Sequence, residues 1–361
     1  MNLAIYGAKA TALGAYEAIH SIYPQRRITC FIVTKRENNA EILCGVPVME
    51  LEFYAGALSK EEKANTEILI ATPENVMPEI EKSLDEQGLC CHVRLTSMRF
   101  AEMLGYYHVC DKDFIPLAAL PVGYHRAGMH MFMAKFYQDK ILSSAYGLPE
   151  WITPIQVGTA LCEERVANIY DNDGENISEK NGNYSELTAL YWIWKNRLLQ
   201  NLPGAGDEFY GLSHYRRILE LSDDDILKLA DNDVDVVLPY PMPYEPNIEA
   251  HHKRYLKDKD WEAMFTAVRE IQPAYAEKLP EILGQQYLYH YNIILARKEV
   301  LANYCAWLFP ILERTEELSE PKGCDRKDRY IGYMGETLET IYFMANKDKL
   351  NIAHAGCRFL T

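Results

Sequence analysis

The stretch LAIYGAKATALGAYEAIHSIYPQRRITCFIV, residues 3–33, decides the fold of the first half of the chain. Residues 3–6 form a short apolar run, residues 11–22 carry apolar side chains at helical spacing, and residues 28–33 form a second apolar run. A strand, a helix and a strand in this order predict a right-handed crossover between parallel strands. The alternation continues, with strands expected at 67–71 and 89–95 and a helix at 78–87. We therefore expect a Rossmann-like domain with a parallel sheet.

The turn after the first expected strand matches only part of a dinucleotide-binding pattern. That pattern needs three glycines, for a tight turn, for close approach of the pyrophosphate and for helix packing. Gly7 meets the first need, and Gly14 lies inside the expected helix. Lys9 and Ala12 stand where the second and third glycines belong. Two interpretations stay open: a Rossmann-like module with a structural role, or a nucleotide-dependent oxidoreductase or epimerase.

The length and charge of the chain limit what it can be. A chain of 361 residues is longer than one core usually grows, so two domains are expected, over residues 1–120 and 121–361. The 52 acidic and 37 basic residues give a formal net charge of −15, which would repel a nucleic-acid backbone. We therefore expect no nucleic-acid partner.

Two further features concern the compartment and bound metals. The N-terminus lacks a basic and apolar leader pattern, and no later run approaches the apolar length of a membrane-spanning helix. The nine cysteines form no CxxC pair, so neither a zinc site nor a disulfide framework is expected. The sequence thus predicts a cytoplasmic protein without a transmembrane segment.

The second half also alternates between helical and extended patterns. Residues 184–199 carry apolar side chains at helical spacing, and the runs at 208–217 and 234–245 are typical of strands. Residues 289–317 have the pattern of a strand followed by an amphipathic helix. This order predicts a second α/β domain.

Five segments of this half are shared with a known family: PIQVGTAL (154–161), YDNDGENISEKNGNYSELTALYWIWKN (170–196), FYGLSHYRR (209–217), YNIILARKEVLANYCAWLFPIL (291–312) and DRYIGYMGETLETIYF (328–343). Over residues 129–345 the chain resembles the domain-of-unknown-function family 4422. Its members occur in capsule and O-antigen gene clusters and are regarded as glycosyltransferases, some of which transfer galactofuranose. The resemblance implies a GT-A-like domain, a UDP-sugar donor and a surface-polysaccharide acceptor. A lipid-linked acceptor would bring the enzyme to the inner face of the cytoplasmic membrane as a peripheral protein. A non-catalytic glycan-assembly protein is the alternative to an enzyme.

One position departs from the pattern of that family. The family usually has a His-Lys pair after its first strand, where this chain has Ala134 and Lys135. Any role of that histidine is therefore absent here.

The first half has a resemblance of its own, carried by IYGAKATALG (5–14), FIVTK (31–35), GVPVMEL (45–51) and ILIATPEN (68–75). These segments are similar to the small N-terminal domain of bacterial sugar-modifying acyltransferases. The similarity implies a module attached to sugar-nucleotide chemistry.

The end of the strand expected at 208–217 bears on how a donor would bind. In GT-A transferases a helix commonly precedes a strand whose end carries Asp-x-Asp, which holds a divalent metal on the donor diphosphate. His214 and Arg216 stand in that position here, followed by Arg217. Guanidinium groups match phosphate oxygens in bidentate fashion, so Arg216 or Arg217, with His214 as a hydrogen-bond donor, are expected to stabilise the departing diphosphate without a cofactor. Ion pairs with surface acids are the alternative for the arginines, and a Mg or Mn ion is the alternative for the diphosphate.

The polar loop DNDGENIS, residues 171–178, is a second candidate for donor binding. Asp171, Asn176 and Ser178 offer donors and acceptors for a sugar or a base, and Gly158 closes the preceding strand. The alternative is a surface turn, because Asn, Asp and Gly favour turns in any case.

Four further residues are candidates for contact with the sugars. Glu186 opens the helix expected at 184–199, and Asn292 stands at the head of an apolar strand, so both are expected to bind sugar hydroxyls. An inverting transferase needs a carboxylate base near the acceptor hydroxyl, and Glu336 is the expected base, with Asp328 as second choice. The alternatives are a helix-capping role for the acids and a satisfied core amide for Asn292.

Overall fold

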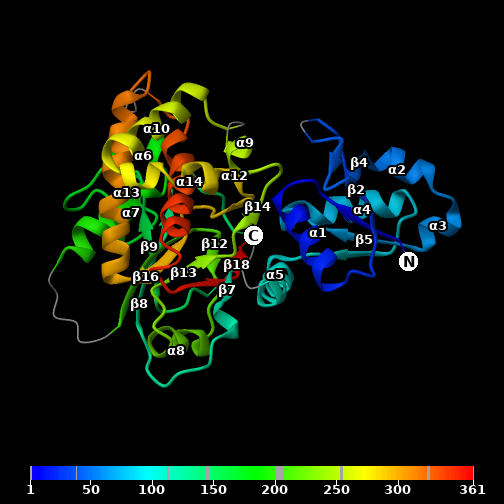
Figure 1. Ribbon diagram of the computed structural model, residues 1–361, viewed down its shortest axis with the longest axis horizontal. Coiled ribbons are helices and arrows are strands. Elements are labelled where there is room, and N and C mark those ends of the chain that lie inside the picture. Colours follow the sequence, from blue (N-terminus) through cyan, green and yellow to red (C-terminus); the bar gives the residue numbers. More distant parts are fainter. Residues whose placement is uncertain are drawn as a thin grey trace. The chain divides into compact units, whose positions relative to one another are not determined.

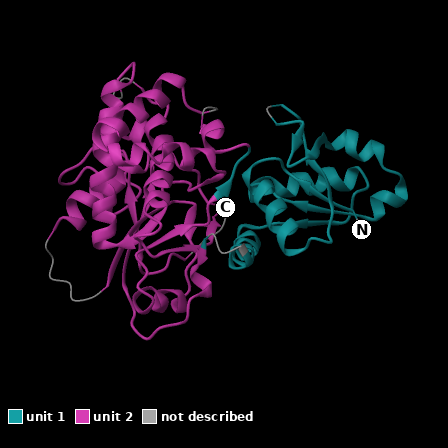
Figure 2. Cartoon of the chain, viewed as in Figure 1, with its two compact units in different colours: residues 1–114, 242–245, 361 teal, residues 115–241, 246–360 magenta. Residues whose placement is uncertain are grey.

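The computed structural model describes residues 2–37, 39–111, 114–142, 147–200, 207–252, 255–322 and 326–360. The chain divides into two compact units, drawn in teal and magenta in Figure 2. Unit 1 contains residues 1–114 with the short segment 242–245, and unit 2 contains residues 115–241 and 246–360. Within the described ranges, no helix has the length and apolar character needed to cross a membrane.

Unit 1 is built on a parallel sheet, as the sequence predicts. From one edge to the other its strands are β3 (Ile42–Leu43), β4 (Val46–Glu50), β2 (Ile28–Val33), β1 (Asn2–Tyr6), β5 (Thr66–Ile70) and β6 (His92–Arg94). All neighbours are parallel except β3 and β4. Without β3, the five strands, numbered along the chain, lie in the order 3-2-1-4-5, which is the order of one Rossmann half extended by two strands. The connecting helices are α1 (Ala10–Ile22), α2 (Leu51–Ala57), α3 (Lys60–Ala64), α4 (Met77–Glu86) and α5 (Ser97–Asp111).

The two glycines of the first turn have structural reasons to be there. Gly7 has a φ of +127°, and a Cβ at this position would lie 2.5 Å from the carbonyl oxygen of Ala71 at the end of β5. Its N–H donates to the carbonyl of Ile32 at 2.8 Å. A Cβ on Gly14 would lie 3.0 Å from the ring of Phe100, so this glycine lets α1 and α5 pack closely. The structural interpretation therefore accounts for both residues.

Unit 2 contains a larger mixed sheet (Figure 1). Its strands follow the order β10 (Ile169–Tyr170), β9 (Ile152–Gln156), β8 (Gly128–Lys135), β11 (Glu208–His214), β16 (Ile294–Arg297), β13 (Val236–Pro239), β17 (Ile352–Ala355) and β7 (Ile115–Pro116). The first four are mutually parallel, and β16 runs antiparallel to both of its neighbours. Two short strands, β12 (Arg217–Leu219) and β18 (Cys357–Phe359), extend the sheet beside β11. The expected mixed α/β architecture is confirmed.

Helices α13 and α14 run side by side in Figure 1, and α10 also packs against α13. The α-helices of the unit are α6 (Asn181–Tyr184), α7 (Leu187–Ile193), α8 (Asp223–Asp231), α9 (Ile248–His252), α10 (Asp258–Ile271), α11 (Pro273–Ala276), α12 (Leu279–Gly284), α13 (Lys298–Leu318) and α14 (Tyr330–Ala345). The helix expected at 184–199 is interrupted, because Ser185 has a φ of +50° and separates α6 from α7. A π-helical turn, Trp194–Leu198, then follows α7.

The strand expected at 208–217 is also two elements rather than one. It ends at His214, which pairs with Arg217 across a tight turn formed by Tyr215 and Arg216. The carbonyl of Arg216 accepts a hydrogen bond from the N–H of Leu360 at 2.8 Å. The turn that carries the cationic side chains is therefore held from both sides by β11 and by the C-terminal strand.

The order of the parallel strands predicts where a ligand would bind in unit 2. From β8 the chain continues to β9 and β10 on one side, whereas β11 lies on the other side of β8. In open α/β sheets the crevice at such a reversal, beyond the carboxyl ends of the strands, is the usual ligand site. The register places His214 opposite Ala134, so the turn after β11 and the loop after β8 meet there.

Candidate functional site

A cavity of about 850 Å³ lies at these carboxyl ends. Its wall is formed by the loop after β8, the segment after β9, residues 179–186, the turn after β11, Tyr291 and the segment that leads into α14. The volume lies in the range typical of small-ligand sites. All of these segments belong to unit 2.

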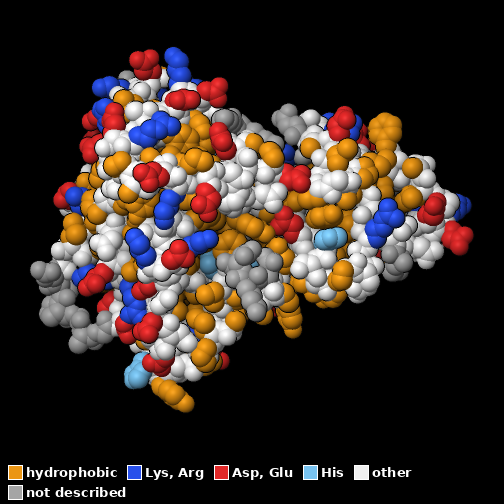
Figure 3. Space-filling model, in the orientation of Figure 1, with side chains coloured by type: hydrophobic (Ala, Val, Ile, Leu, Met, Phe, Trp, Pro, Cys, Tyr) orange, Lys and Arg blue, Asp and Glu red, His pale blue; other side chains and the backbone are white. Residues whose placement is uncertain are grey.

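The charge of the wall differs from that of the whole chain. Its Lys and Arg residues are Lys180, Arg216, Arg217, Arg326, Lys327 and Arg329, and its carboxylates are Asp139, Glu179 and Glu186. On the face of the molecule drawn in Figure 3, by contrast, acidic and basic side chains lie interspersed. A cationic cavity in a chain of net charge −15 favours an anionic ligand.

Arg216 and Arg217 both line the cavity. The Nε of Arg216 is buried and has no hydrogen-bond partner among the residues that the structure describes. The guanidinium of Arg217 lies 4.1 Å from the ring centroid of Tyr291 and 4.9 Å from that of Phe359. In the described ranges neither arginine forms an ion pair, although acidic residues are abundant in the sequence. The alternative role of these arginines, ion pairing with surface acids, would need such pairs, and none is formed within this part of the chain.

His214 is held at the cavity wall by two partners. Its Nε2 lies 2.7 Å from the carbonyl oxygen of Tyr291, and because a carbonyl only accepts, this nitrogen carries a proton. The same nitrogen lies 3.6 Å from Oε1 of Glu186. The ring is thus fixed, with its Nδ1 left as the second polar atom.

Glu186, the second partner of His214, is buried. Its Oε1 accepts a hydrogen bond from Nδ2 of Asn292 at 2.6 Å. Burial would raise the pKa of Glu186, but the charge of the nearby His214 and the hydrogen bond from Asn292 outweigh it and hold the pKa below its usual value. Glu186 is therefore an ionised anchor for His214, and Asn292 is bonded inside the protein and does not line the cavity.

Asp171 does not line the cavity but ties together the segments behind its wall. It is fully buried and accepts hydrogen bonds from the N–H groups of Gly158 and Thr159 at 2.8 and 3.0 Å. It also accepts from the hydroxyls of Ser178 and Thr188 at 2.5 and 2.7 Å. The sequence predicted that three of these residues, Gly158, Asp171 and Ser178, would contact the donor. In the structure their polar groups form hydrogen bonds with each other instead.

Asn176 has a similar local role. Its Nδ2 donates to the carbonyls of Gly174 and Asn172 at 2.8 and 3.3 Å, which closes the turn of the loop. Asn176 does not line the cavity either. The loop shapes the wall through its neighbours Glu179 and Lys180, which do line it.

Glu336, the expected base, lies behind Tyr291 and not on the cavity wall. Its Oε1 accepts the N–H of Tyr291 at 3.2 Å, and its side chain is 15% exposed. Burial, with a smaller effect of the charge on Glu186, raises the pKa of Glu336 to about 8. The carboxyl therefore holds its proton at neutral pH.

Asp328, the second choice as base, is committed to neighbouring groups. It accepts hydrogen bonds from Nη2 and Nε of Arg326 at 2.7 and 3.2 Å. Burial would raise the pKa of Asp328, but these hydrogen bonds outweigh it and lower the pKa. Asp328 is not on the wall, although Arg326 is.

The structure adds Asp139, which the sequence analysis did not single out. Asp139 follows β8 and lines the cavity with His214 and Arg216. Its Oδ2 accepts the N–H of Phe136 at 2.7 Å, and burial raises its pKa. Its place directly after a strand of the parallel set is the signal that would have found it.

The backbone around the cavity is strained at four residues. Ser185, Tyr291, Asn292 and Arg329 have φ values of +50°, +66°, +50° and +62°. Such conformations cost about 1–3 kcal/mol each for residues other than glycine, and they cluster at functional sites. Four such residues around one cavity indicate a functional site, at which the backbone conformation is kept despite its cost in folding stability.

The GT-A-like domain expected from the sequence raises the question of a divalent metal. Among the residues that the structure describes, no three His, Cys, Asp or Glu side chains come together in a cluster that could hold one. Of the acidic side chains on the wall, Glu186 is bonded to Asn292, and guanidinium groups occupy the turn after β11.

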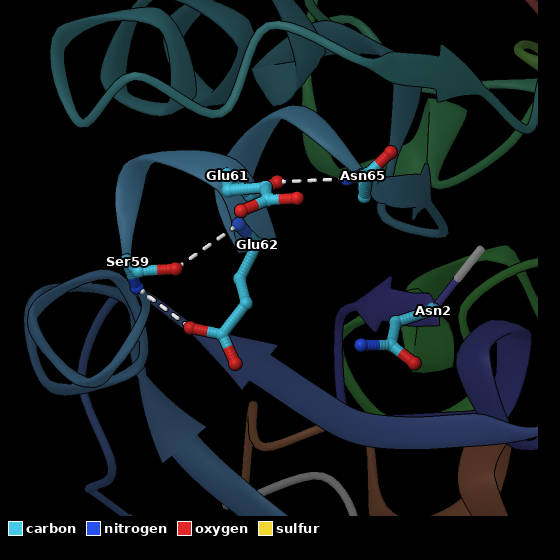
Figure 4. A pocket seen from close by; sticks show the side chains of 5 residues that line it. All are labelled: Asn2, Ser59, Glu61, Glu62 and Asn65. Carbon is cyan, nitrogen blue, oxygen red and sulfur yellow. Dashed lines mark hydrogen bonds between the residues drawn. The ribbon is translucent and has the colours of Figure 1, made fainter.

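A second depression lies in unit 1 and is shown in Figure 4. Its residues Ser59 and Glu62 form a capping box at the start of α3, with distances of 2.8 and 3.2 Å. Asn65 donates to the carbonyl of Glu61 at 3.1 Å. These polar groups satisfy the ends of a short helix, so capping explains them.

The fold is a mixed α/β fold with parallel sheets, and its cavity lies at the carboxyl ends of parallel strands. The chain belongs to the DUF4422 family, a domain of unknown function, whose family description matches residues 144–347. A solved structure described as the apo form of the bifunctional glycosyltransferase WbbM is similar, with a TM-score of 0.54 and 24% identity. The similarity covers 65% of this chain and 45% of that one, so the match spans less than half the length of that protein. No curated protein matches the chain.

Proposed function

We propose that the protein is a glycosyltransferase that moves a sugar from a nucleoside-diphosphate donor to a glycan acceptor. The observation that supports this most is the pair Arg216 and Arg217, free of ion pairs within the described residues, on the wall of a cavity at the carboxyl ends of parallel strands. Sugar transfer breaks the bond between the anomeric carbon and the diphosphate, and the leaving group gathers negative charge. Guanidinium groups fixed beforehand stabilise that charge.

The proposed roles follow from the geometry. Arg216 and Arg217 bind the diphosphate oxygens, and His214, oriented by Tyr291 and Glu186, donates a further hydrogen bond. The acceptor hydroxyl attacks the anomeric carbon and gives its proton to a carboxylate. We propose Asp139, the partly buried carboxylate that the wall presents, as the first choice for this base. Glu336, the base expected from the sequence, would serve only above about pH 8, where its carboxyl is ionised.

The finer assignment rests on the family resemblance. We propose UDP-galactofuranose as the first donor to test, and a capsule or O-antigen glycan, free or lipid-linked, as the acceptor. The corresponding place of action is the cytoplasmic face of the membrane, as a peripheral protein. Transfer is proposed to proceed without a divalent metal.

A thermal-shift screen of the full chain with UDP, several UDP-sugars and NAD(P) tests the class of ligand. UDP-sugars are expected to raise the midpoint in EDTA as well as in Mg or Mn, because binding to the native state stabilises it. The hits are then assayed for transfer to glycan acceptors. A shift with NAD(P) alone would instead support the oxidoreductase alternative, and a shift with glycans alone would support an assembly protein.

A further inference from the structure

Arg329 is a cavity cation that the sequence analysis did not identify. It directly precedes α14 and lines the cavity wall. Its Nε donates to the hydroxyl of Ser185 at 2.9 Å, and its backbone N–H donates to the carbonyl of Gly182 at 3.2 Å. Two segments far apart in the sequence are thus joined at this arginine.

The join is made by residues in strained conformations. Arg329 has a φ of +62°, and Ser185 has a φ of +50° with a ψ of −129°. A Cβ on Gly332 would lie 3.3 Å from Oγ of Ser185, so the first turn of α14 packs tightly on the same segment. Non-glycine residues keep such conformations only where the surroundings impose them. The guanidinium is therefore held at a fixed place on the wall.

A comparison with Arg326, three residues earlier, shows what Arg329 lacks. Arg326 is buried and bonded to both carboxylate oxygens of Asp260, at 2.7 and 2.6 Å, and also to Asp328. Its charge is satisfied within the protein. Arg329 forms no ion pair in the described part of the chain, and within its guanidinium group only Nε has a hydrogen-bond partner there. Its two terminal nitrogens are available to a ligand.

We propose that Arg329 is a second arm of the anion site and binds oxygens of the same diphosphate as Arg216 and Arg217. The ligand class is a nucleoside diphosphate, and the inference rests on the proposed function. The two terminal N–H₂ groups of a guanidinium suit a phosphoryl group better than a single ammonium does. The site then draws on two separate parts of the chain, the turn after β11 and the entry to α14.

The test is calorimetric titration of UDP into the full chain and into Arg329→Gly. Glycine accepts the positive φ, so this variant keeps the backbone while removing the guanidinium. The affinity for UDP is expected to fall about 10- to 100-fold, because one charge-assisted contact is lost. The thermal midpoint is expected to stay within about 3 °C of the wild type. Arg314→Ala is the matched control, because Arg314 is a partly exposed arginine on α13, outside the cavity wall, paired with Glu270 and Glu317.

Each outcome decides the matter. A loss of affinity with the midpoint kept, and an unchanged affinity in Arg314→Ala, supports the inference. Unchanged affinity in Arg329→Gly contradicts it, and so does a loss of affinity accompanied by a large fall in the midpoint, which would show a structural role. If the wild-type chain does not bind UDP at all, the proposed function itself fails, which is a different result.

Discussion

Replacing Arg216 by alanine should separate catalysis from stability. The Nε of Arg216 is buried without a partner in the described part of the chain, so the side chain carries a desolvation cost of about 1–3 kcal/mol that the variant relieves. Against this stand ring contacts at 5.4 Å with Tyr215 and Phe359, worth about 0.5–1 kcal/mol each at accessible sites. The free energy of unfolding is therefore expected to change by no more than about 2 kcal/mol.

The effect on turnover should be much larger. A donor aimed at developing charge in the transition state is worth about 100- to 1,000-fold in kcat. The assay is UDP release at saturating donor and acceptor, with unfolding in urea measured on the same preparations. Arg314→Ala again removes one arginine outside the cavity wall and should leave kcat unchanged. A kcat of Arg216→Ala near that of the wild type would refute the role assigned to this residue, and so would a loss of several kcal/mol in stability.

Three further changes test the rest of the site. Asp171→Asn should lower the free energy of unfolding by about 3 kcal/mol, measured in urea, because four donors lose a carboxylate acceptor; wild-type stability would contradict its structural role. Glu336→Gln should flatten the pH dependence of stability between about pH 4.5 and 8: the unfolded chain releases this proton above its usual pKa, the folded chain keeps it up to about 8, so wild-type stability falls as pH rises through that window. An unchanged slope would show that this carboxyl does not have a raised pKa. Asp139→Asn should lower kcat about 100-fold or more while UDP still binds, if Asp139 is the base; a loss in Glu336→Gln alone would assign the base to Glu336.

Much of the fold could be predicted from apolar periodicity. The runs at 3–6 and 28–33 are strands β1 and β2, and the helix expected at 11–22 is α1, because buried parallel strands are continuous apolar segments. The break after His214 could not be predicted in the same way. The turn Tyr215–Arg216 contains no glycine, asparagine or proline, so no turn signal interrupts the strand pattern.

The candidate site shows the same limit. A short polar loop has the same residue pattern whether its side chains bind a ligand or other parts of the protein. Asp171 binds other parts of the protein, because Gly158 and Thr188 reach it only in the folded chain. The cationic residues of the turn after β11 could be identified from the sequence, because charge at the end of an apolar strand is unusual. Asp139 and Arg329 were not, because only the fold brings the loop after β8 and the entry to α14 to one cavity.

The most direct test of the central claim is calorimetric titration of UDP into the wild-type chain in the presence of EDTA. The account predicts saturable binding at one site, weakened about tenfold or more in Arg216→Ala, because the cavity supplies fixed guanidinium groups in place of a metal. Absence of binding, or binding that appears only after Mg or Mn is added in excess, would contradict it.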